Sequence, residues 1–192
     1  MGYSPEAVMN SLEITNSVIG CRACKFRDYL DYGDLPSIGV GKTPADIMLI
    51  NFKATKESHL IEKPVCARNE LLLRKMLQMA GISYSSTYLT NLIKCNGPIT
   101  PAKVLLQNGS TCYHTHLVHE IRLVQPKAIV CFGTTVPKVL IGDMSATVSS
   151  EYEYNSIPLY VVYSLEHLYR RGKAYMDEAI KTLQKAKLCL NQ

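Results

Sequence analysis

Four cysteines most constrain what this chain can fold into. Cys21 and Cys24 form the motif C-R-A-C, Cys95 ends the segment T-N-L-I-K-C, and Cys112 follows after sixteen intervening residues. These cysteines lie among segments that read as alternating strands and helices, so only the fold can bring them to one place. We therefore predict a buried metal cofactor gathered from distant parts of the chain, with an iron–sulfur cluster as the first interpretation.

A structural zinc ion is the main competing interpretation, because zinc sites built from four cysteines are common. Zinc ribbons usually present two C-x-x-C turns, whereas this chain has one such turn and two separate single cysteines. We favour an iron–sulfur cluster over zinc and over four unrelated thiols. A group of histidines at 114, 116 and 119 does not complete a ligand set, and we expect these residues to be solvated or to cap a helix.

Composition limits the class of protein. The chain has 192 residues, of which 47% are hydrophobic, so it can bury one core, and we expect a single domain over residues 1–192. No apolar run approaches the roughly 18 residues of a membrane span, and the N-terminus lacks the regions of a secretion signal. We expect a soluble, cytoplasmic protein. Its seven cysteines, an odd number, favour thiols and metal ligands over a disulfide framework.

Apolar and amphipathic segments alternate along the chain. This order predicts an α/β protein, a three-layer α/β/α sandwich with a mostly parallel, four-stranded central sheet. In such a sheet the ligand site lies at the carboxyl ends of the strands, here expected after Ile50, Leu89, Phe132 and Val162. The segment 31–44 is expected to be a loop. The predicted strands are 45–52, 87–92, 128–132 and 158–163, and the predicted helices are 4–19, 69–80, 112–124, 134–140 and 173–188.

Several of these segments resemble the iron–sulfur uracil-DNA glycosylases, known as family 4, over most of the chain. The stretch C-R-A-C with the later I-G-V-G-K-T-P-A-D-I-M-L-I resembles the family's first cysteine pair, glycine loop and first strand. Y-L-T-N-L-I-K-C-N-G-P-I-T-P-A resembles its asparagine strand and third cysteine, and I-R-L-V-Q-P-K-A-I-V-C-F-G-T-T a later helix, strand and glycine turn. The resemblance implies a 4Fe–4S cluster, a fold that binds DNA across its strand ends, and as cluster ligands Cys21, Cys24, Cys95 and Cys112.

The catalytic positions depart from that family. It supplies a carboxylate in G-E-A-P-G, an aromatic face for the flipped base, a strand asparagine and the histidine of H-P-S, which together support cleavage of the glycosidic bond. The matching positions of this chain hold Phe52, Val65, Asn91 and Ser164. Two glycines of the first loop are also replaced, by Asn51 and Thr55. Loss of three groups together predicts a protein without useful glycosylase activity.

Two questions stay open at this level. Asn91 could read a uracil edge, or it could be a structural amide at a strand end. Activity could also be rescued by acid–base groups near the mouth of the site, for which the candidates are Glu57, Glu62, His59 and His167.

A silent relative of these enzymes could still bind DNA. The formal net charge of +5 falls to roughly +3 when a cluster with its four thiolates adds about −2, and mild basicity permits a polyanion partner. Lys53 and Lys56 beside the former catalytic loop predict a mouth suited to phosphate. Phosphate contacts need only basic side chains and backbone amides. The candidates are Gly39, Gly41, Lys42, Gly133, Thr134, Thr135, Arg170 and Arg171.

The sequence therefore predicts a catalytically silent, DNA-binding accessory or scaffold in replication or repair. Its partners would be DNA and a DNA polymerase or other replication protein. Modules resembling this family are known as polymerase-associated accessory domains, notably in viruses, and a viral member would act in the host cytoplasm or nucleoid. The alternatives are a diverged, active glycosylase in base excision repair, and an interaction module that does not bind nucleic acid.

Overall fold

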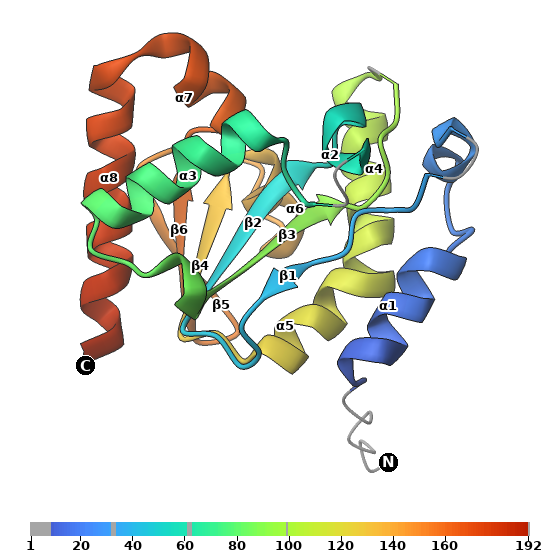
Figure 1. The fold of residues 1–192 in the computed structure, drawn as a ribbon, viewed down its shortest axis with the longest axis horizontal. Helices are drawn as coiled ribbons and strands as arrows, with labels where there is room; N and C mark the ends of the chain where they lie inside the picture. The colour runs from blue at the N-terminus through green and yellow to red at the C-terminus, as the bar shows by residue number, and fades with distance from the viewer. Residues whose placement is uncertain (1–8, 32–33, 61–62, 99, 192) are drawn as a thin grey trace.

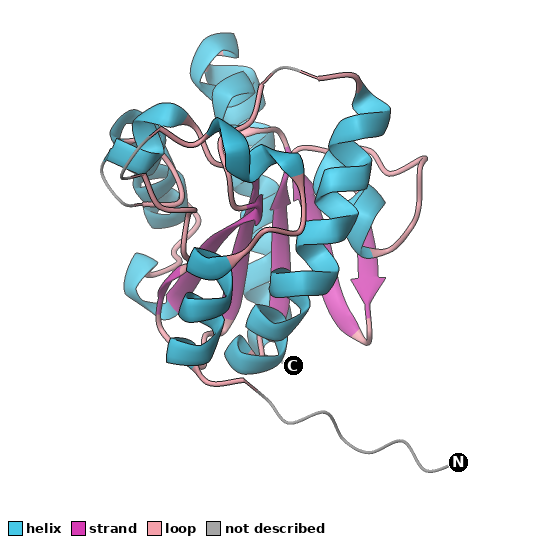
Figure 2. Ribbon diagram, turned by 90° about the vertical axis from the view of Figure 1, so that its right-hand side faces the viewer, coloured by secondary structure: helices cyan, strands magenta, loops and turns pink. Residues whose placement is uncertain are grey.

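The computed structural model describes residues 9–31, 34–60, 63–98 and 100–191. A central sheet lies between two layers of helices, as Figures 1 and 2 show from two directions. This is the α/β/α sandwich that the alternation of strand and helix patterns predicted. Within the described ranges, no helix is long and apolar enough to cross a membrane.

The sheet has six strands in the order β1-β3-β2-β4-β6-β5. Its four central strands are parallel and almost wholly apolar, as expected for strands covered on both faces. In spatial order they are β3 (Thr87–Ile93), β2 (Ile47–Lys53), β4 (Ala128–Phe132) and β6 (Ile157–Val162). Their carboxyl ends lie together at one edge of the sheet, where the ligand site was predicted.

The expected number of four strands was wrong, because a short antiparallel strand is added at each edge. At one edge β1 (Val40–Gly41) pairs with β3, within the segment expected to be a loop. At the other edge β5 (Glu151–Tyr154) forms a hairpin with β6. Its two-residue turn is Asn155–Ser156, both with positive φ, the backbone shape that favours tight hairpins.

One helical layer covers the face of the sheet that carries Ile47 and Leu49. Its helices pack Leu73, Leu168 and Leu183 into this core. They are α3 (Ala67–Met79), α7 (Leu165–Arg171) and α8 (Lys173–Leu188), and the short turns η2 (Tyr84–Ser86) and η4 (Cys189–Asn191) flank this layer.

The other layer covers the face that carries Met48 and Ile50. The predicted helix 112–124 is part of a longer helical stretch that begins after Pro101, and it contains a π-helical segment, η3 (Tyr113–Leu117). The α-helices of this layer are α4 (Ala102–Cys112), α5 (Val118–Val124) and α6 (Thr135–Leu140).

The N-terminal helix is shorter than the sequence predicted. Helix α1 (Ser11–Gly20) begins after Asn10, whose side chain accepts from the Glu13 N–H while Glu13 caps Asn10 in return. The expected start of this helix, in residues 4–8, lies outside the described residues. Helix α1 packs against α5 and η3, and it leads into η1 (Lys25–Tyr29), while α2 (Lys56–Leu60) follows β2.

Candidate functional site

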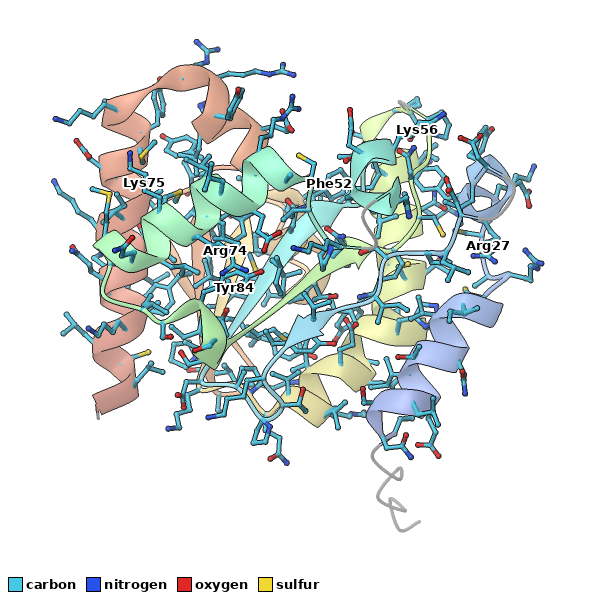
Figure 3. The ribbon with its side chains drawn as sticks, viewed as in Figure 1. Arg27, Phe52, Lys56, Arg74, Lys75 and Tyr84 are labelled. Atoms are coloured by element: carbon cyan, nitrogen blue, oxygen red, sulfur yellow. The ribbon has the colours of Figure 1, made fainter. Side chains whose placement is uncertain are left out.

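At the strand ends, the position of the expected carboxylate holds a hydrocarbon ring. Phe52 lies near the end of β2, below α2 with its Lys56 (Figure 3), and packs half-buried against the core under α4 and α5. A phenyl ring can neither accept a proton nor orient a water molecule. The chain therefore carries no acid–base group at this position.

Asn91 lies fully buried on β3, beside Asn51 on β2. Its Nδ2 donates to Ser37 Oγ at 2.9 Å and to the carbonyl oxygen of Pro64 at 2.7 Å, and its Oδ1 accepts from Asn51 Nδ2 at 2.7 Å. Both N–H donors of the amide are thus used within the protein. Of the two readings left open by the sequence, this geometry supports the structural one, and Asn51 supplies a contact that a glycine could not.

The other two degenerate positions also have structural roles. Val65 is 2% exposed and packs in the core under α3, so it offers no face to a flipped base. Ser164 is the N-cap of α7, and its Oγ accepts from the His167 N–H at 3.3 Å. The segment that replaces H-P-S is therefore the capped start of a helix.

His59, a candidate for rescue, is buried and held at both ring nitrogens. Its Nδ1 donates to the Leu35 carbonyl at 2.6 Å, and its Nε2 accepts from the Asn96 N–H at 3.1 Å. Burial lowers the pKa of this imidazole, which favours the neutral ring that these two contacts require.

The remaining candidates for rescue lie on separate elements. His167 stacks on Tyr163 with ring centres 4.9 Å apart and meets the edge of Tyr175, while its buried Nε2 has no partner among the described residues. Glu57 is exposed on α2. Glu62 lies outside the described residues.

The two lysines expected to make the mouth cationic already have protein partners. Lys53 Nζ donates to the Gly97 carbonyl at 2.7 Å, and its partial burial lowers the pKa of the ammonium. Lys56 forms an ion pair with Asp31 at 2.7 Å. A phosphate at these two side chains would therefore compete with their protein partners.

The four predicted ligand cysteines lie on three separate segments, the C-R-A-C turn, the loop after β3 and the end of α4, and their thiols influence one another's pKa. The pKa of the Cys95 thiol is raised to about 12, mainly by burial and to a smaller extent by Cys112, Cys24 and Cys21. The pKa of Cys112 is likewise raised to about 11, mainly by burial, with Lys94 opposing the rise and Cys24 and Cys21 adding to it. All four are free of disulfides. Four cysteines are the ligand number and type of a cluster held by thiolates, but in the described residues their side chains are not gathered into a metal-binding group.

The segment after the C-R-A-C turn packs against the loop after β3. The ring of Phe26, two residues past Cys24, lies against Gly97, two residues past Cys95. A Cβ atom on Gly97 would lie 2.6 Å from that ring, so only glycine allows this contact.

No group of three or more His, Cys, Asp or Glu side chains that could hold a metal ion is formed in the part of the chain that the structure describes. The histidines after Cys112 do not act together either. His114 is exposed, whereas His116 is buried with its Nδ1 bonded to Ser17 Oγ at 3.3 Å. The expectation of solvated or capping histidines is therefore wrong for His116, because η3 turns it into the contact with α1.

Sequence reasoning missed a buried ion pair beside the cysteines. Lys94 Nζ lies 2.5 Å from Glu120 Oε2, with 1% and 0% of the two side chains exposed. Thr90 and Tyr88 add hydroxyl groups to the same cluster. The available signal was the presence of a lysine and a glutamate at core positions of apolar segments, where unpaired charges are rare.

Part of the predicted DNA-binding set lies at the carboxyl ends of the strands. Gly133 forms the turn after β4 with φ of 85°, although its N–H already donates to the Val162 carbonyl at 2.8 Å. Thr134 and Thr135 begin α6. Arg170 and Arg171 are exposed in the last turn of α7.

The other part lies at the opposite end of the sheet. The Lys42 N–H donates to the carbonyl of Thr87, the first residue of β3, and Gly41 pairs with Tyr88. A Cβ atom on Gly39 would lie 2.2 Å from the Tyr88 hydroxyl, so this glycine serves close packing. The structure thus does not bring Gly39, Gly41 and Lys42 together with the residues around α7.

With the fold and these positions defined, comparison with known proteins shows the family. Residues 38–184 match the model of the uracil DNA glycosylase superfamily, and the chain belongs to that superfamily.

Within it, two type-4 uracil-DNA glycosylases are similar to this chain. The protein of Archaeoglobus fulgidus is 29% identical over 131 residues, which are 65% of this chain and 61% of that protein. The protein of Sulfurisphaera tokodaii is 27% identical over 144 residues, which are 74% of this chain and 63% of that protein. The chain thus spans less than two thirds of the length of either relative. The resemblance to family 4 is confirmed.

Proposed function

We propose that this protein is an iron–sulfur, DNA-binding member of the superfamily that does not excise bases and serves as an accessory or scaffold in DNA replication or repair. The observation that carries the proposal is the hydrogen bonding of Asn91, whose amide is used by Asn51, Ser37 and Pro64. The one family group that remains at the site is thus committed to the protein itself.

The cofactor proposed is a 4Fe–4S cluster held by Cys21, Cys24, Cys95 and Cys112. Such a cluster would supply a structural cross-link, because these residues tie the segment after α1 to the loop after β3 and to the end of α4. The four cysteines are free thiols on segments whose electrostatic effects reach one another, and this supports the proposal.

DNA is the proposed ligand of the surface at the carboxyl ends of the strands. Arg68 and Asn69 at the start of α3 bond Glu166 of α7 at 3.0 and 3.1 Å, so the end of α7 with Arg170 and Arg171 is held against the domain. Exposed arginines on a fixed element suit contacts to phosphates.

A protein partner, such as a DNA polymerase or another replication protein, is also part of the proposal. A hollow of about 380 Å³ between α3, α7 and α8 supports it, since Met79 and Tyr169, which line it, are 51% and 56% exposed. Apolar side chains gathered on a surface are typical of interaction sites.

One assay on duplex DNA with a single uracil tests the proposal. The protein is purified without oxygen, incubated with uracil DNA and with matched thymine DNA, and scored for mobility shift and for strand cleavage after alkali. An active type-4 enzyme is the positive control. We expect a shift on both duplexes that weakens with salt, and no cleavage.

Two results would contradict this expectation. Cleavage of the uracil strand would identify a diverged, active glycosylase, and loss of that cleavage on changing Glu57 or His167 would locate the rescuing group. Absence of a mobility shift even at low salt would indicate the other alternative, an interaction module that does not bind nucleic acid.

A further inference from the structure

The hollow between α3, α7 and α8 lies apart from the four degenerate positions and from the cysteines. The three helices meet at one corner of the molecule, as Figure 1 shows. Its wall is mostly apolar and is formed by Leu72, Met79, Leu168, Tyr169 and Met176. Its volume of about 380 Å³ lies in the range of pockets that enclose small ligands or a few side chains. Covering such an open apolar surface with a partner is favourable, because it removes hydrocarbon from water.

The helices that form the hollow are held together by contacts within the chain. The Glu166 carboxylate of α7 accepts hydrogen bonds from Arg68 and Asn69 of α3 at 3.0 and 3.1 Å. The Arg68 guanidinium also lies 5.3 Å from the centre of the Tyr169 ring, which lines the hollow. Leu168 packs in the core that α3 and α8 share. A docking segment would therefore meet a surface that is already formed, and little of this chain would have to be ordered on binding.

The rim of the hollow carries more positive than negative charge. Lys75 on α3 (Figure 3) and Lys173 at the start of α8 line it, and both are exposed. Within the described ranges neither ammonium forms an ion pair, whereas Lys56 and Lys127 do. Asp177 is the single carboxylate among the lining residues that the structure describes. The two ammonium groups are thus available to carboxylates from outside the chain.

An apolar wall with a cationic rim suits a peptide better than DNA. The phosphates of DNA gain from lysines, but they gain little from covering methionine and leucine side chains. An amphipathic helix presents both kinds of group, with apolar side chains at i, i+3 or i+4 and i+7 that enter a groove, and acidic side chains beside them. Met79 and Met176 have flexible thioether side chains, which adapt to apolar groups of different shape.

We propose that this hollow is the docking site for a short amphipathic segment of a partner protein, whose apolar side chains pack on Leu72 and Met176. Acidic side chains of the same segment pair with Lys75 and Lys173. The inference rests on the proposed accessory function and names the chemistry of the partner. It does not depend on the cluster.

The probe is a phage-displayed library of random peptides of about 16 residues, a little over four helical turns, selected against the full chain. Enriched peptides are synthesised with a fluorescent label, and their dissociation constants are measured by anisotropy. We expect the enriched sequences to place apolar residues at helical spacing, with Asp or Glu beside them.

Two variants locate the binding site of these peptides. Lys75→Glu/Lys173→Glu should weaken binding by about tenfold, because two favourable pairs become repulsive. Met79→Ser removes apolar contact area at an exposed position and should weaken binding by about threefold. The matched control is Lys42→Glu/Lys103→Glu, which changes the net charge equally at exposed positions that do not line the hollow. It should bind the peptides with nearly wild-type affinity.

Four results would overturn the proposal. The selection could enrich no peptide, or the control could lose as much peptide affinity as Lys75→Glu/Lys173→Glu. Light scattering could show a dimer that Met79→Ser disrupts, and a second copy of the chain would then cover the hollow. Finally, Lys75→Glu/Lys173→Glu could weaken the binding of duplex DNA as much as that of the peptides, and the hollow would then belong to the DNA surface.

A mobility shift on duplex DNA, measured with the same preparations, separates this inference from the proposed function. Peptide binding without a DNA shift would overturn the DNA-binding part of the proposed function and leave this inference standing. A DNA shift without peptide binding would overturn this inference alone.

Discussion

At the scale of single residues, the site is defined by Asn51, whose side chain forms a hydrogen bond with the strand asparagine Asn91. Asn51 stands at the position of the first glycine of the family motif G-E-A-P-G, and its side-chain amide donates to Asn91. Because both residues lie on adjacent parallel strands in register, the contact is fixed by the sheet and not by a loop. The strand asparagine thereby becomes part of the core.

This predicts that Asn91 matters for folding. In Asn91→Ala, Ser37, the Pro64 carbonyl and Asn51 lose their partner, and buried polar groups left without one should lower the free energy of unfolding by about 2–3 kcal/mol. Asn16→Ala, on the exposed side of α1, should change it by less than about 0.5 kcal/mol. Urea unfolding measures both. An Asn91→Ala protein of wild-type stability that has lost preference for uracil DNA would indicate a base-reading amide instead.

At the scale of elements, helix α7 begins at the position where the family has its H-P-S segment. The segment in place of H-P-S starts a helix at Ser164, and the Glu166 carboxylate joins it to α3 through Arg68 and Asn69. Burial raises the pKa of Glu166, but the pairing with Arg68 outweighs it and the net pKa is lowered, so the carboxylate is charged at neutral pH. The helix then ends in two arginines.

We therefore expect α7 to carry much of the DNA affinity. Arg170→Ala/Arg171→Ala should weaken binding equally for all sequences and reduce the slope of log affinity against log salt by up to about 2, as expected when two phosphate contacts are lost. The matched control is Lys42→Ala/Lys127→Ala, at the amino ends of the strands. Fluorescence anisotropy over a salt series measures the slopes. Equal losses in both double variants would contradict a DNA surface at the strand ends.

At the scale of the whole molecule, the four predicted ligand cysteines lie on three segments that are far apart in the sequence. The loop from Cys24 to Cys95 contains β1, β2 and α3, and closing a loop of this length costs conformational entropy. A bound cluster would be a cross-link that offsets this cost only in the folded state.

Cys95→Ala should therefore prevent folding, because it removes one ligand of the proposed cross-link. We expect low soluble yield, no iron and no visible colour. Cys189→Ala removes one thiol at the C-terminal end and should keep both colour and yield. Iron content and the visible spectrum of the soluble fraction measure the difference. A well-folded, colourless Cys95→Ala protein would contradict a structural cluster.

The strength of local patterns explains which parts of the fold could be predicted. The strand 128–132 and the helix 173–188 are found at their predicted bounds, because each is a single uninterrupted pattern. Strand β5 was missed, although E-Y-E-Y followed by Asn-Ser is a usable hairpin signal. The π-helical segment η3 has no such local signal, and it packs against α1 and β3, which are distant in the sequence.

The candidate site was less predictable than the fold, for a physical reason. The four cysteines could be chosen by type and order, and the substituted positions by comparison with the family. The bonds of Asn91 and the pairing of Lys94 with Glu120 join residues 26 or more positions apart in sequence, and no periodicity reports them. The same limit explains why Gly39, Gly41 and Lys42 were grouped with residues at the far end of the sheet.

Asn91, Lys94 and Cys95 lie within five consecutive residues of β3 and its exit. The segment that would bind iron is therefore the segment that organises the strand edge. If the proposed cluster anchors this segment, the supply of iron would limit how much of the chain folds, because a chain without iron would lack the cross-link at the end of β3.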